Sequence, residues 1–200
     1  MAGTFGPQDV AEDGRTQVGS WVATGAVGYA GVFAGNDYNI GGRVTGVGVP
    51  DGATITSATV TVQVTATGGT SVDVRCYAED TDDAAAIAAR GPTQPGPAWT
   101  LTTAFETVAV NPGTGALAIP FTGPMQELID RTGWTWTAGT GSPDVAFALL
   151  NQQASGTDYL QIELLEATGT NQMTLTVNYT VAGGSAVPAA SHSYRQRRAS

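Results

Sequence analysis

Lysine is absent from this chain of 200 residues, and cysteine and histidine occur once each. A single cysteine excludes an internal disulfide and any metal site built from several cysteines. No apolar run approaches the roughly 20 residues of a membrane-spanning helix. Residues 1–9 also have neither the basic end nor the apolar stretch of a secretory signal. We therefore expect no disulfide, no membrane insertion and synthesis in the cytoplasm without a signal peptide.

Positive charge is scarce as well, because eight arginines face seventeen acidic residues and the net charge is −9. Such a surface repels phosphate, so we expect no nucleic-acid binding by the acidic body. The hydrophobic share of 42% is too high for a disordered chain. The length is sufficient for one domain with a sizeable core.

Apolar and polar residues alternate with period two, which predicts β-strands. The clearest stretches are residues 54–65 and 172–181, where valine or leucine alternates with threonine. Weaker strands are predicted over residues 27–33, 43–49, 116–121, 144–151 and 158–165. Glycine-rich turns separate these runs, a pattern typical of an all-β antiparallel sandwich.

One short helix is predicted over residues 124–131, where a proline lies near the start and a glycine follows the end. Met125, Leu128 and Ile129 recur at i, i+3 and i+4, so one apolar stripe can dock on the sandwich. A second helical turn is predicted over residues 84–87.

The period-two alternation places Cys76 on the same face of a strand as Val72 and Val74. A cysteine in this position is predicted to be a small, buried side chain.

The composition divides the chain into an N-terminal arm (1–9), the sandwich (10–181) and a flexible tail (182–200). The tail ends in a basic segment formed by Tyr194, Arg195, Arg197 and Arg198. Guanidinium groups bind carboxylates in a bidentate way, so this segment is a candidate anchor on an acidic neighbour, such as another copy. The alternative is an unbound, solubilising tail.

Four segments occur in the order of known motifs: VPDGATITSATV (49–60), YAEDTDDAA (77–85), MQELIDRTGW (125–134) and LTVNYT (175–180). They resemble the motifs IP-x-GATITSA, GEATDNAA, QEIVNRPGW and LVVTYT of jelly-roll modules in tailed-phage virion proteins, which are similar to carbohydrate-binding domains. Two departures stand out. Thr132 replaces the family's proline, and the family's RRAS-like element before the last strand is absent.

The resemblance implies an antiparallel jelly-roll β-sandwich with one short helix. It also implies a non-enzymatic structural protein on the exterior of a phage virion, here expected on the tail as a minor tail protein. A capsid decoration or head-fibre protein is the alternative. Expected partners are other virion proteins and copies of the same chain, with contact to host-surface glycans as an addition.

Trp99, Trp134 and Trp136 are candidates for glycan binding, because indole rings stack on the C–H faces of sugars. The alternative is that these rings close the ends of the sandwich.

Glu79, Asp80, Asp82 and Asp83 are the densest acids and a weak candidate for calcium, although their spacing is not that of an EF-hand. The alternative is a solvated turn in which Asp82 or Asp83 caps the next segment. No cofactor is expected.

An enzyme is not expected. The only histidine, His192, lies in the predicted tail and is poorly placed to activate a serine or cysteine. A pair of carboxylates can cleave glycosides without histidine, so a polysaccharide-degrading enzyme stays as a further alternative.

Overall fold

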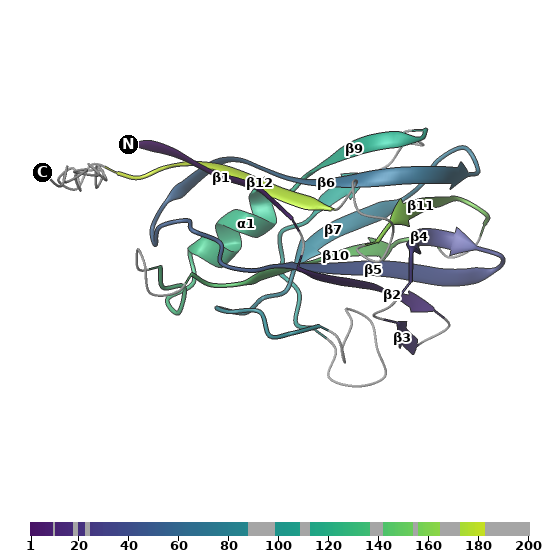
Figure 1. Cartoon of the computed structure of the whole chain (residues 1–200), viewed down its shortest axis with the longest axis horizontal. Helices are drawn as coiled ribbons and strands as arrows, with labels where there is room; N and C mark the ends of the chain where they lie inside the picture. The colour runs from purple at the N-terminus through teal and green to yellow at the C-terminus, as the bar shows by residue number, and fades with distance from the viewer. Residues whose placement is uncertain are drawn as a thin grey trace, which may run out of the picture.

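The computed structural model describes residues 1–9, 11–17, 20–22, 25–87, 99–108, 113–136, 142–153, 156–164 and 173–182. These parts form twelve β-strands and one α-helix (Figure 1). The strands are β1 (Ala2–Asp9), β2 (Glu12–Gln17), β3 (Ser20–Val22), β4 (Val27–Phe33), β5 (Asn36–Val44), β6 (Thr54–Gly68), β7 (Val74–Ala78), β8 (Glu106–Val108), β9 (Gly115–Pro120), β10 (Val145–Asn151), β11 (Tyr159–Glu163) and β12 (Thr174–Thr180), and the helix is α1 (Thr122–Ile129).

Strands β4 to β11 form two antiparallel sheets, in the orders β4-β11-β6-β9 and β5-β10-β7-β8. This is the strand order of a jelly roll. Strand β5 connects the two sheets, because it pairs with β4 through residues 36–38 and with β10 through residues 40–44. The predicted fold, an antiparallel jelly-roll β-sandwich with one short helix, is confirmed.

Two further strands extend the first sheet. β12 pairs with the first half of β6, and β1 pairs with β12. Residues 1–9, expected as a separate arm, thus belong to the sheet: Phe5 packs against the core, and the Thr4 hydroxyl donates to Asn178 Oδ1 at 2.8 Å. On the second sheet, β2 pairs with β5, and β3 pairs with β2.

Strand β10 is buried on both faces. Val145, Phe147 and Leu149 enter the main core between the sheets. The alternate residues of β10 point the other way, into a second apolar group that we call the outer cluster: Ala84, Ile87, Trp99, Ala146, Ala148 and Leu150. Segments around residues 84–87 and 99–101 therefore cover the outside of the second sheet and give it a small core of its own.

The predicted strands and the helix are found close to their predicted positions, with two exceptions. Of the strand expected over residues 43–49, only residues 43 and 44 are in a strand, the end of β5 (Asn36–Val44), because Gly46 turns the chain with a positive φ of 67°. Residues 84–87 are not helical: the carbonyl of Ala84 accepts from the Arg43 guanidinium, and the amide of Ile87 donates to Glu12. Their backbone groups thus bond to distant segments instead of to one another.

Cys76 is fully buried, as expected, and burial raises the pKa of its thiol.

In the parts of the chain that the structure describes, no helix has the length and apolar character needed to cross a membrane.

The packing of Gly42 predicts a measurable cost of one added methyl group. A Cβ at this position would lie 2.5 Å from the ring of Phe147, a fully buried side chain. We expect Gly42→Ala to lower the free energy of unfolding by about 1–3 kcal/mol, measured by urea denaturation. The control is Gly48→Ala, where the nearest atom would lie at 3.5 Å, an ordinary contact. Equal stability of the two variants would contradict the packing described here.

Candidate functional site: a polar groove beside the helix

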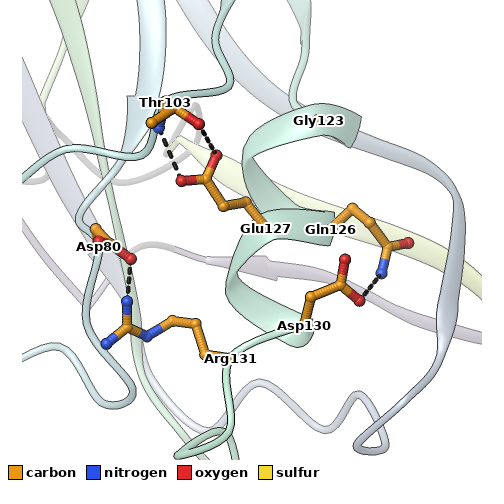
Figure 2. Close-up of a pocket in the computed structure, with 7 residues that line it drawn as sticks. All are labelled: Asp80, Thr103, Gly123, Gln126, Glu127, Asp130 and Arg131. Atoms are coloured by element: carbon orange, nitrogen blue, oxygen red, sulfur yellow. Dashed lines mark hydrogen bonds and ion pairs between the residues drawn. The ribbon is translucent and has the colours of Figure 1, made fainter.

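An open groove of about 640 Å³ lies beside α1 (Figure 2). Five of its lining residues come from α1 or the turn after it, and two come from the segments that face the helix. The lining residues are Asp80, Thr103, Gly123, Gln126, Glu127, Asp130 and Arg131.

Glu127 points from α1 to the segment before β8. Its carboxylate accepts from the amides of Thr103 and Ala104, at 2.8 and 2.7 Å, and from the Thr103 hydroxyl at 3.0 Å. Partial desolvation acts to raise the pKa of Glu127, but these hydrogen bonds and the nearby Arg131 outweigh it and hold the pKa below its usual value. Glu127 is thus a fixed anion, which is the wrong state for a general acid.

Arg131 follows α1 and binds residues 79–84, which we call the acidic segment. Its guanidinium forms an ion pair with Asp80, and its Nε donates to Asp82 Oδ1 at 2.6 Å. The hydrogen bond to Asp82 is the main cause of the raised pKa of Arg131. Asp83 instead accepts from the amide of Asp144 at 2.8 Å.

The calcium candidate consists of Glu79, Asp80, Asp82 and Asp83, and Glu79 is almost completely buried. In the described residues, no three acidic, histidine or cysteine side chains are grouped as a metal site requires. The structure therefore places Asp80 and Asp82 in an ion pair with Arg131 and offers no geometry that supports the calcium interpretation.

Gln126 and Trp134 tie α1 and the turn after it to the segment that leads into β6. The Gln126 side chain accepts from the amide of Ile55 at 2.7 Å and donates to the carbonyl of Ala53 at 3.2 Å. Trp134 Nε1 donates to the carbonyl of Val49 at 3.1 Å.

The four segments that carry the family resemblance therefore meet in space. Gln126 and Trp134 connect the helix motif to residues 49–60, Arg131 connects it to residues 77–85, and β12 pairs with β6. These motif side chains contact one another and hold α1 at one end of the sandwich. This convergence was not expected from any one motif.

The three candidate tryptophans do not form a common surface. Trp134 is buried in the main core, and Trp99 is buried in the outer cluster on the other side of β10. Only Trp136 is partly exposed. Trp99 and Trp134 are thus unable to stack on a sugar in this structure: Trp134 fills the main core, and Trp99 covers the outside of the second sheet.

An ion-pair network around Arg43 was not foreseen from the sequence. Arg43 bonds to Glu12 Oε1 at 3.0 Å, forms an ion pair with Asp144, and donates to the carbonyl of Ala84 at 2.9 Å. Glu12 also accepts from the amide of Ile87 at 2.6 Å. No spacing rule connects these residues, because the fold alone brings them together.

A cluster of four aromatic rings on β4, β5 and β11 was also missed. Tyr29 and Phe33 stack with centroids 4.2 Å apart, and Tyr38 and Tyr159 contact both rings edge-on. Gly31 lies between the stacked residues with a positive φ of 118°. The rings pack against one another, so they do not make an open stacking platform. Their period-two spacing on β4 was the available sequence signal.

The basic segment of Tyr194, Arg195, Arg197 and Arg198, together with His192, lies outside the described residues.

No family model matches this chain, and no curated protein matches it.

The charge of Glu127 predicts a pH-dependent contribution to stability. Because its pKa is lower in the folded protein than in the unfolded chain, its contribution is present above the unfolded pKa of about 4.3 and is lost as the pH falls through the folded value. We expect Glu127→Gln to lower the free energy of unfolding by about 1 kcal/mol at pH 7. The difference should shrink below pH 4 in urea unfolding curves.

The control for this experiment is Asp51→Asn, a change at an exposed turn. A loss for Glu127→Gln that stays constant from pH 7 to pH 3 would contradict the assignment of the charge.

Proposed function

We propose that this protein is a non-enzymatic structural component of a tailed-phage virion, exposed on the tail as a minor tail protein. The proposal is supported by the four motifs and by a jelly-roll sandwich, the fold that the resemblance implies. A capsid decoration or head-fibre protein is the alternative placement.

The observation that carries the proposal is that polar side chains of the motifs form hydrogen bonds with other segments of the fold. Gln126, Arg131 and Trp134 bond to backbone or to carboxylates of the other motif segments. A catalytic or ligand site needs polar groups that face a substrate, whereas here the polar groups of the motifs join parts of the fold. Such an arrangement suits a rigid building block.

The two ends of the described chain favour attachment from one side. Met1 and Val181 exchange two backbone hydrogen bonds, each of 2.7 Å, and the N-terminus lies at one end of the molecule in Figure 1. A protein held at this end presents the rest of the sandwich outward. The basic segment of Tyr194, Arg195, Arg197 and Arg198, which follows β12 in the sequence, is proposed to add an anchor on an acidic neighbour.

The structure adds little to the other functional interpretations. Two of the three tryptophans proposed for glycan binding, Trp99 and Trp134, are buried. A polysaccharide-degrading enzyme needs one carboxyl group that stays protonated, and Glu127 in the groove has its pKa shifted in the opposite direction.

Mass spectrometry and cryo-microscopy of gradient-purified phage particles test the proposal. We expect the chain among the particle proteins and a jelly-roll density on the tail. Jelly-roll density on the head would contradict the tail placement and favour the decoration alternative. Absence of the chain from purified particles would overturn the proposal as a whole.

A further inference from the structure

Strand β1 is an outer edge of the sheet, and its pairing with β12 determines which backbone groups are free. Met1 and Val181 exchange both of their backbone hydrogen bonds. In an antiparallel ladder, such pairs alternate with pairs whose backbone groups point outward. The N–H and C=O groups of Gly3 and Phe5 therefore face β12, and those of Ala2 and Thr4 point away from the sheet.

The other outer strands in the described part of the chain are protected in ways that β1 is not. Strands β3 and β8 have three residues each, and β8 begins with Glu106. Strand β9 ends in Pro120 and lies beside β8. Short length, charge and proline are the usual means of blocking a sheet edge. In β1, the bulge at Gly6 and Pro7 and the terminal Asp9 protect only the second half of the strand, so residues 2–5 are open.

Apart from the N-terminal ammonium of Met1, the edge from residue 1 to residue 8 carries no charged group. Residues 1–8 and strand β12 contain no aspartate, glutamate or arginine, although the chain carries a net charge of −9. Two copies of an acidic protein repel each other over most of their surfaces. At this edge, a second copy can approach without placing one acid against another.

We propose that two copies of this chain pair through β1, antiparallel and around a two-fold axis at Gly3. In this register, Ala2 of one copy lies opposite Thr4 of the other, so every outward backbone group of these residues finds a partner. Gly3 of one copy lies opposite Gly3 of the other copy at the axis. The two form a non-hydrogen-bonded pair, in which Cα atoms approach to about 4.5 Å.

The side chains on this edge agree with the register. Gly3 has no side chain on the inner face because the ring of Tyr179 occupies that place, 2.6 Å from where a Cβ would lie. Ala2 and Thr4 are small and exposed on the outer face. The pairing would make one continuous sheet, through β12 and β6, in both copies. It does not depend on the proposed place in a virion.

Charge pairs at positions 2 and 4 test the register. Sedimentation velocity of the full chain should show a shift from 20.3 kDa to twice that mass as concentration rises. Ala2→Glu with Thr4→Glu places acids opposite each other and should weaken the dimer, whereas Ala2→Arg with Thr4→Glu places opposite charges together. We expect the dissociation constants of the two variants to differ at least about tenfold.

The control is Ala116→Glu with Ala118→Glu on the exposed face of β9, which adds the same charge elsewhere. Urea unfolding confirms that each variant is folded. A full chain that stays monomeric at about 1 mM, or equal dissociation constants for the two β1 variants, would overturn the proposal. Equal weakening by the β9 control would do the same, because it would make net charge the cause.

Amide exchange measured by NMR gives an independent readout. The amide of Thr4 should exchange more slowly as concentration rises, while that of Phe5, already bonded to β12, should not change. A Thr4 amide protected equally at all concentrations would contradict the pairing and point to an intramolecular cover, such as the C-terminal tail.

Discussion

The scarcity of positive charge is the constraint on which this structure depends. The four arginines in the described residues, Arg15, Arg43, Arg75 and Arg131, all contact other parts of the body. Arg43 is the most buried of the ion-paired ones, and it bonds to Glu12, Asp144 and the carbonyl of Ala84. Breaking such a partly buried network leaves charges without partners, which costs more than the ion pair gains.

Two arginines fix the two ends of the acidic segment. Arg131 holds Asp80 and Asp82 against the turn after α1, and Arg43 holds Ala84 against the second sheet. The segment consequently covers β10 from outside and completes the outer cluster. An acidic run that could have bound a metal is part of the framework instead, and this use of polar side chains underlies the proposal of a structural role.

The sequence predicted those elements whose signals are local. Alternation of valine and threonine located β6 and β12, and apolar spacing located α1. Features that depend on tertiary contacts could not be predicted from the sequence. Glu12, Arg43 and Asp144 are far apart in the chain, and only the pairing of β5 with β2 and β10 brings them together. The same contacts take up the backbone groups of residues 84–87 and override their helical propensity. Residues 1–9 carry too little alternation, with glycine and proline at positions 6 and 7, to reveal a strand.

A double-mutant cycle on Arg43 tests the central claim most directly. The free energy of unfolding is measured in urea for Arg43→Met, Glu12→Gln and the double variant. If Arg43 and Glu12 act as one unit, each single change is costly, and the coupling energy is about 1–3 kcal/mol. Hydrogen exchange at the amide of Ile87, which donates to Glu12, should accelerate in both single variants. Two effects that add to within about 0.5 kcal/mol, with unchanged exchange at Ile87, would contradict the account.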